Sequence, residues 1–240
     1  IGASGAAGGV GVGWVESFKR AAGGFVSDTL VIFTKSHLKM SLVYATLKAT
    51  GGLVWGPADV MNLKFSEVED LQVGDQAVTL GITYAFVGIG CFFGPPLSSV
   101  FFDPKEELHL ISSIVFAIAL LGVGYLAWAL AGDFWAVQLG NLLRSSASSI
   151  IWIKSTILLQ HVSDRQYLGR LFALEVAFYT ISNASSSYTV AAMLDFGFMR
   201  QKTICALLCG LSCVLFALWA YIKAKRRTTT VHQYQLIYNK

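Results

Sequence analysis

Long runs of apolar residues alternate with short polar connections along the whole chain. A helix needs about 20 predominantly apolar residues to cross a bilayer. Six stretches reach this length, namely residues 40–60, 76–102, 110–132, 134–159, 171–194 and 203–222. The connections between these stretches are short, except for the acidic loop 61–75. The pattern therefore predicts an all-α membrane protein whose transmembrane domain, residues 40–222, has six transmembrane helices.

Polar side chains recur at helical spacing on three of these stretches. In the first, the polar or small residues are Ser41, Tyr44, Lys48, Gly52, Trp55 and Asp59. In the fourth they are Asn141, Arg144, Ser148, Trp152 and Ser155. In the fifth they are Glu175, Tyr179, Ser182, Ser186 and Thr189. Steps of three and four residues place each set on one helix face. The faces either surround a common cavity or, as small-residue stripes do, form packing seams between helices.

Intramembrane charge is confined to the same three stretches. The first contains Lys48, the fourth Arg144 and Lys154, and the fifth Glu175. A charge at a helix centre costs about 2.5–3.5 kcal/mol on insertion scales, so such residues face a partner or water. Lys154 and Glu175 fall at similar depth on consecutive helices, which predicts that they pair. Alternatively, Lys154 extends its ammonium to the membrane surface.

Composition narrows the class of protein. Hydrophobic residues make up 55% of the chain and charged residues 13%, whereas a soluble domain carries about 25% charged residues. This excludes a soluble enzyme, a disordered protein and a nucleic-acid binder, for which a net charge of +4 is also too small. We expect the lipid bilayer as a partner and no nucleic acid.

The distribution of Lys and Arg predicts the orientation, because cytoplasmic loops carry an excess of both. The side richer in these residues carries Lys19, Arg20, Lys35, Lys39, Lys105, Arg165, Arg170, Lys223, Lys225, Arg226, Arg227 and Lys240. The other side carries Lys64, Arg200 and Lys202. We therefore expect a multi-pass protein with both ends of this chain in the cytoplasm, as an even number of spans requires.

The two ends of the chain differ from the transmembrane domain. Residues 1–14 are rich in Gly and Ala, and residues 16–39 mix apolar and charged side chains. We interpret residues 1–39 as a Gly-rich segment followed by an amphipathic cytoplasmic connector on the membrane surface. Residues 223–240 form a basic cytoplasmic tail. Because the chain begins at Ile1, we expect it to be a fragment.

Local motifs agree with one transporter family. The sequence from His161 to Arg170, with its Gly169-Arg170 pair, precedes the fifth stretch, and a Gly-rich segment runs from Gly88 to Pro95 in the second. Together with six spans, cytoplasmic ends and an amphipathic connector, these motifs resemble the C-terminal half of a major facilitator superfamily transporter. The likeness is to the macrolide-efflux and siderophore-exporter group, and it covers residues 18–222. Between Ser98 and Lys105, this chain keeps only one acidic and one basic residue of that family's charged loop.

The resemblance implies one half of a secondary active transporter, which moves a small organic solute across the membrane by alternating access around a midplane site. It implies that the first, fourth and fifth spans line the path and that the third and sixth are peripheral. The expected pathway residues are Tyr44, Lys48, Trp55, Asp59, Asn141, Arg144, Ser148, Trp152, Tyr179, Ser182 and Ser186. It also implies an efflux-type transporter driven by protons, with Glu175 as the coupling group, and a missing N-terminal half as partner. The gate residues at the cytoplasmic side would be Asp103, Lys105, Arg165 and Arg170.

The two cations Lys48 and Arg144 favour an anionic or zwitterionic solute. Two other functions stay open: a membrane scaffold or receptor-like protein with dry seams, and a rhomboid-type intramembrane serine protease, whose motif Gly2-Ala3-Ser4-Gly5 matches. No nucleotide-phosphate loop occurs, so ATP-driven transport has no support in the sequence. Cys205, Cys209 and Cys213 suit apolar packing better than metal binding. As a transporter, the protein is expected to have no cofactor, no metal and no enzyme activity.

Overall fold

A computed structural model describes residues 13–17, 19, 23, 33–34 and 39–238. Within 39–238 the regular elements are helices. They are α2 (Lys39–Ala45), α3 (Leu47–Trp55), α4 (Ala58–Ser66), the short 3-10 helix η2 (Glu69–Leu71), α5 (Gln76–Phe101), α6 (Glu107–Leu130), α7 (Phe134–Val162), α8 (Leu168–Asp195) and α9 (Gln201–Tyr238). The protease-like motif 2–5 and most of the predicted connector lie outside the described residues.

The helices begin and break where the sequence directs. Asp75 and Asp133 cap α5 and α7, because each carboxylate accepts a hydrogen bond from the backbone N–H three residues on, at 2.8 Å. The first predicted span is divided into α2, α3 and α4. Its main break falls at Gly56 and Pro57, since proline has no N–H to continue the helical ladder.

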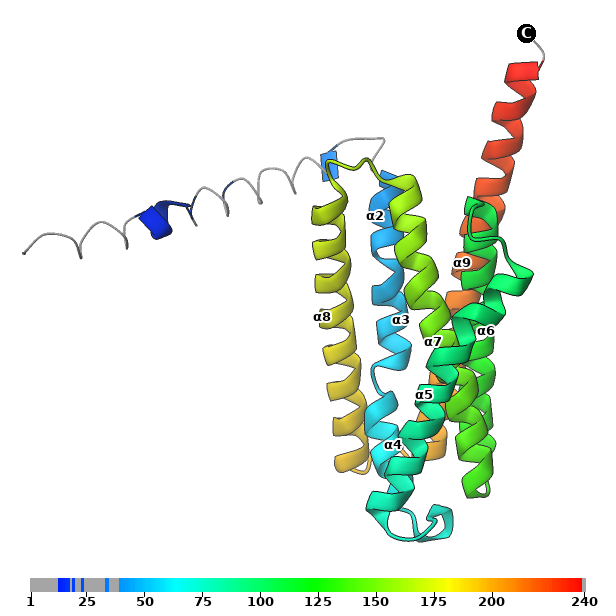
Figure 1. The fold of residues 1–240 in the computed structure, drawn as a ribbon. Coiled ribbons are helices and arrows are strands. Elements are labelled where there is room, and N and C mark those ends of the chain that lie inside the picture. Colours follow the sequence, from blue (N-terminus) through cyan, green and yellow to red (C-terminus); the bar gives the residue numbers. More distant parts are fainter. Residues whose placement is uncertain (1–12, 18, 20–22, 24–32, 35–38, 239–240) are drawn as a thin grey trace, which may run out of the picture.

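The helices alternate in direction through one bundle (Figure 1). The start of α2 and the far end of α9 lie at the same end of it. The main packing partners are α3 with α8, α5 with α7, and α6 with both α7 and α9. The basic segment 223–227 continues α9 as a helix.

Three helices of the described part are long and apolar enough to cross a membrane: α5, α6 and residues 201–228 of α9. The other three predicted spans are the ones with polar faces. α7 and α8 have 29 and 28 residues, which suffices in length, but serines and buried charges lower their apolar character. The first span is divided into short helices, so none of its pieces reaches membrane length.

Aromatic side chains on α6 and α9 anchor these two helices to the first span. The Tyr125 hydroxyl donates to the carbonyl of Val54, and the Trp219 indole N–H donates to Thr50 Oγ1 at 3.2 Å. Trp128 packs edge-on against Phe65 with ring centroids 5.2 Å apart. With α7 on one side and α9 on the other, α6 is the most buried of the three apolar helices.

The serines near the middle of α8 have a structural role. The Ser186 hydroxyl donates to the carbonyl of Gly52 at 3.0 Å, and the Ser187 hydroxyl donates to the carbonyl of Gly56 at 2.6 Å. These carbonyls flank the break at Pro57. Gly52 O also accepts the backbone N–H of Gly56 at 3.0 Å, so the Ser186 hydroxyl adds a bond between α8 and α3 and does not replace a lost one. Ser186 and Ser187 therefore form a seam that holds α8 against the broken first span.

Close contact between α5 and α7 depends on two glycines. A Cβ atom at Gly94 would lie 2.6 Å from the carbonyl oxygen and 2.8 Å from the Cα of Ser146. A Cβ at Gly90 would lie 2.7 Å from the carbonyl oxygen of Leu142. Because these neighbours are backbone atoms, they cannot rotate away, and α5 would have to move.

We predict that Gly94→Ala lowers the free energy of unfolding by about 1–3 kcal/mol, as overpacking does. Gly88→Ala, in the same helix, is the matched control, because nothing lies within 4 Å of its Cβ position and alanine favours helix formation. Melting temperatures of the purified protein in detergent measure both. Equal effects of the two variants would show that the α5–α7 contact is not tight.

Candidate functional site

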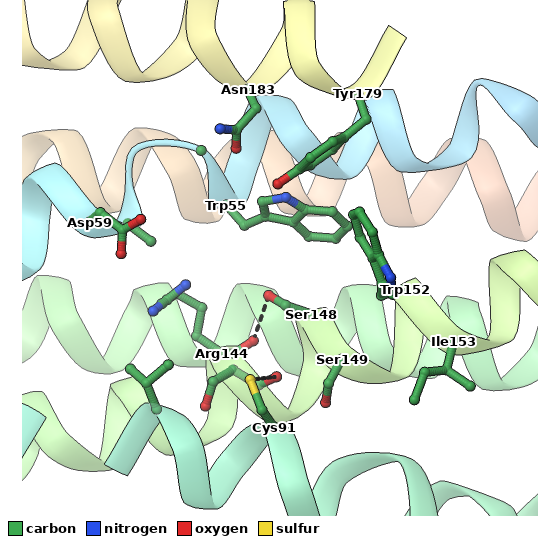
Figure 2. Close-up of a pocket in the computed structure, with 14 residues that line it drawn as sticks. Trp55, Asp59, Cys91, Arg144, Ser148, Ser149, Trp152, Ile153, Tyr179 and Asn183 are labelled. Atoms are coloured by element: carbon green, nitrogen blue, oxygen red, sulfur yellow. Dashed lines mark hydrogen bonds between the residues drawn. The ribbon is translucent and has the colours of Figure 1, made fainter. Parts of the chain in front are cut away.

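A cavity of about 420 Å³ opens between the helices with polar faces (Figure 2). Its walls come from α3, α4, α5, α7, α8 and the break at Gly56. The lining residues are Trp55, Gly56, Ala58, Asp59, Val87, Cys91, Arg144, Ser145, Ser148, Ser149, Trp152, Ile153, Tyr179 and Asn183. Neither α6 nor α9 contributes a residue to it. The two helices expected to be peripheral thus lie away from the cavity, although α6 is well buried.

Part of the predicted pathway lines this cavity. The residues that do so are Trp55, Asp59, Arg144, Ser148, Trp152 and Tyr179. The sequence did not predict the wall from α5, formed by Val87 and Cys91, or the amide of Asn183. Because α5 carries no charge, the sequence gives no polar face that would mark it as a cavity wall. The four-residue spacing of Val87 and Cys91 shows only that both lie on one side of the helix.

Arg144 is the central charged group of the cavity. Its side chain is 5% exposed, and its Nε–H has no hydrogen-bond partner. Nη2 donates a long hydrogen bond, 3.4 Å, to Asn141 Oδ1, and the guanidinium lies 5.0 Å from the ring centre of Trp128. Among the described residues, no carboxylate lies within 4.0 Å of it. The guanidinium therefore carries a positive charge that has polar and aromatic contacts, one unpaired N–H and no carboxylate partner among the described residues.

Asp59 supplies the acidic side of the same cavity. Its carboxylate accepts a hydrogen bond from the Tyr84 hydroxyl at 3.2 Å and is exposed. Figure 2 shows Arg144 extending from α7 toward the wall where Asp59 lies. A positive and a negative group on facing walls can hold the two ends of a zwitterion, or an anion at Arg144 alone.

Three aromatic rings form the other end of the cavity. Tyr179 packs edge-on against Trp152 with ring centroids 5.0 Å apart, and its ring centre lies 6.0 Å from that of Trp55. Figure 2 shows the three side chains gathered together. Trp152 is 40% exposed, so part of its ring is available to a ligand. These rings offer a flat apolar surface next to a charged group, the usual composition of a small-molecule site.

Lys48 and Glu175 form a buried ion pair beside the cavity. Lys48 Nζ lies 3.0 Å from Glu175 Oε2 and donates a second hydrogen bond to Thr156 Oγ1 at 2.8 Å. It also lies 4.3 Å from the ring centre of Trp152. Glu175 is fully buried, and its Oε1 has no hydrogen-bond partner. Lys48 is thus neutralised and does not line the cavity as we expected.

The predicted pairing of Glu175 with Lys154 is wrong. Lys154 Nζ instead donates to Ser99 Oγ on α5 at 2.8 Å. The expectation failed because similar depth on consecutive helices does not make two residues neighbours. α8 packs against α3, which carries Lys48, whereas the Lys154 face of α7 turns toward α5.

Four other predicted pathway residues lie outside the cavity. Asn141 is fully buried beside Arg144, Ser182 does not reach the lining, and Ser186 closes the α3 break. Tyr44 lies at the end of the bundle, where its hydroxyl donates to Glu107 Oε1 at 3.0 Å. Arg226 Nε donates to the same hydroxyl at 3.1 Å. Tyr44 therefore joins α2, α6 and α9, which is a structural role.

The predicted gate residues lie at that same end of the bundle. Asp103 and Lys105 fall between α5 and α6, and Arg165 and Arg170 fall between α7 and the first turns of α8. Asp103 Oδ1 accepts a hydrogen bond from the backbone N–H of Lys105 at 2.9 Å. This contact stays within one loop, so a role in gating remains a prediction.

Comparison with protein-family models, with curated proteins and with solved structures finds no match for this chain. Its function must therefore be argued from the cavity and from the chemistry of the groups around it.

The Lys48–Glu175 pair is expected to stabilise the bundle. Glu175→Leu removes the carboxylate and leaves a buried ammonium, which costs about 3–5 kcal/mol for such pairs. The double variant Lys48→Met with Glu175→Leu removes both charges and should recover most of that loss. Melting temperatures of the wild type, both single variants and the double variant give the coupling free energy. Additive effects of the two substitutions would contradict the pairing.

Proposed function

We propose that this chain forms a six-span half of a secondary active transporter for a small organic solute, of the major facilitator type. The observation that carries the proposal is the cavity, where a buried arginine without a carboxylate partner faces three aromatic rings. A charge held inside a membrane bundle faces a partner, a substrate path or water. Arg144 has no ionic partner among the described residues, so a passing solute and water are its natural complement.

The order of helix packing supports a transporter-type bundle. If the first span and α5 to α9 are counted one to six, the main contacts join one with five, two with four, three with four and three with six. An inverted repeat exchanges span one with four, two with five and three with six. This exchange turns the contact of one with five into that of two with four, and it leaves the contact of three with six unchanged. The exchange also turns the contact of three with four into one of six with one, and the hydrogen bond from Trp219 to Thr50 joins these two spans. Inverted repeats of three helices are typical of each half of such transporters.

One helix of the cavity, α8, is largely exposed, which favours a half-transporter. Along the 28 residues of α8, only Leu171, Glu175 and Val190 are buried. We therefore propose that a second six-helix half, or another copy, covers the open side. In this arrangement, the protein spans the membrane six times with both ends of the chain in the cytoplasm, and the exposed sides of α6 and α9 face lipid.

The lining groups favour an organic anion or a zwitterion as solute. A guanidinium binds carboxylate, sulfonate or phosphate groups through paired hydrogen bonds. Trp55, Trp152 and Tyr179 suit a flat apolar body attached to that acidic group. A zwitterion would in addition place its ammonium near Asp59.

Protons are the proposed coupling ion, with Glu175 as the carrier. Protonation of Glu175 would break its ion pair with Lys48 across α3 and α8. Lys48 keeps a hydrogen bond to Thr156 and the ring of Trp152 in that state. The pair thus links two helices of the cavity in a way that depends on proton binding, as exchange between an inward-open and an outward-open state requires.

Thiol labelling tests whether the cavity is open to water from both sides, as alternating access demands. In a variant without native cysteines, Ser148→Cys places one thiol in the cavity wall. An impermeant anionic thiol reagent, which the charge of Arg144 attracts, should modify it when added from either side of sealed vesicles. The matched control is Val214→Cys on α9, which is 64% exposed but faces lipid in this arrangement and should stay unmodified.

Mass spectrometry of the intact protein measures the modified fraction. Absence of labelling at Ser148→Cys from both sides would contradict a transport cavity. It would instead favour the membrane scaffold with dry helix seams.

A further inference from the structure

A second hollow lies between α5 and α7, on the side of the cavity nearer the predicted gate loops. Its volume is about 530 Å³. The lining residues are Cys91, Phe92, Pro95, Pro96, Ser99, Pro104, Ile153, Lys154 and Ile157. Cys91 and Ile153 also line the main cavity, so the two hollows adjoin. Pro104 lies in the loop after α5, so this hollow reaches the end of the bundle.

Lys154 is the charged group of this second hollow. Its side chain is 2% exposed, so its ammonium does not extend to a water-exposed surface. An ammonium has three N–H donors, and the single hydrogen bond recorded for this one goes to Ser99 Oγ. No carboxylate of the described residues lies within 4.0 Å of it.

The three intramembrane cations therefore differ in one respect. Lys48 has a carboxylate at 3.0 Å, whereas Arg144 and Lys154 have none. Both unpaired cations line the adjoining hollows, one in each. They stand ten residues apart on α7, which corresponds to about 15 Å along the helix axis.

We propose that Lys154 is a second anion-binding station on the transport path. It would receive the carboxylate or sulfonate group of an organic anion between its site at Arg144 and the loop end of the bundle. The station rests on the proposed transport function and names its solute class as anionic. Ser99 holds the ammonium at the wall between α5 and α7, and its other two N–H donors are left to bind a ligand in this hollow.

Two anion-binding stations would explain why each of the adjoining hollows contains one cation without a carboxylate partner. An anion that left Arg144 for an apolar passage would lose all of its compensating charge, which is costly in a low-dielectric environment. A second cation in the adjoining hollow lowers that barrier. Ser99 is a neutral partner, and the carboxylate of Asp103 interacts with the ammonium without forming an ion pair, so the ammonium still attracts a passing anion.

The test compares the reaction rates of two thiol reagents of opposite charge. Ile157→Cys, in the full-length protein without native cysteines, lines only the second hollow. Its reactions with 2-sulfonatoethyl and 2-trimethylammonioethyl methanethiosulfonate are measured in lipid vesicles. One nearby unit charge should favour the anionic reagent by about tenfold or more at the effective dielectric of such sites. Excess p-toluenesulfonate, a permanently charged aromatic anion, should slow the reaction further.

Three variants isolate the role of Lys154. Lys154→Gln should abolish both the preference for the anionic reagent and the protection by p-toluenesulfonate. Lys154→Arg should keep both, and Lys202→Gln, which removes an exposed charge at the start of α9, should change neither. The melting temperature of Lys154→Gln should stay near that of the wild type, because no partner charge is left behind.

Each remaining outcome decides between explanations. If Lys154→Gln keeps the anionic preference, or if p-toluenesulfonate gives no protection, Lys154 is only a link between α5 and α7 and the station is refuted. If Lys154→Gln unfolds, protection of Ile157→Cys with Lys154→Arg still decides the matter. Failure of the transport function itself appears separately, as absence of labelling at Ser148→Cys.

Discussion

The cost of placing a charge inside a membrane is the constraint on which this structure depends. Besides Asp59 in the cavity wall, four charged side chains lie within the predicted spans, and they fall into two groups. Lys48 and Glu175 neutralise each other across α3 and α8 at 3.0 Å. Arg144 and Lys154 have no carboxylate within 4.0 Å among the described residues and line adjoining hollows. The paired charges hold helices together, whereas in the proposed function the unpaired charges mark the route of an anion.

Local backbone features place these charges where they can act. The break at Pro57 brings Trp55, Gly56 and Asp59 to the cavity, and hydroxyl groups of α8 bond the neighbouring carbonyls of Gly52 and Gly56. Glycines on α5 allow α7 to approach closely, so that Cys91 and Arg144 border the same space. The aromatic anchors of α6 and α9 support the first span from the side opposite to α8.

Hydrophobic periodicity predicted the helices and the group of residues near the cavity, because both follow from where water is excluded. The all-helical architecture agrees with the structure, and three helices meet the length and composition of a membrane span. Specific pairings could not be predicted in this way. Tyr44 and Ser186 share the polar face of their helices, yet Tyr44 joins α2 to α6 and α9, and Ser186 closes a helix break. Which of two lysines reaches Glu175 depends on which helices pack together, and this information lies in tertiary contacts rather than in spacing.

Exchange of a labelled anion tests the central claim most directly, because it measures passage through the cavity rather than its shape. Full-length protein in lipid vesicles preloaded with p-toluenesulfonate should take up the labelled compound by counterflow. Arg144→Ala should greatly weaken this exchange, since it removes the guanidinium that binds the acidic group. Glu175→Gln should retain exchange but lose accumulation driven by a proton gradient. Exchange that is equally fast in the wild type and in Arg144→Ala, or no exchange in the wild type, would contradict the account.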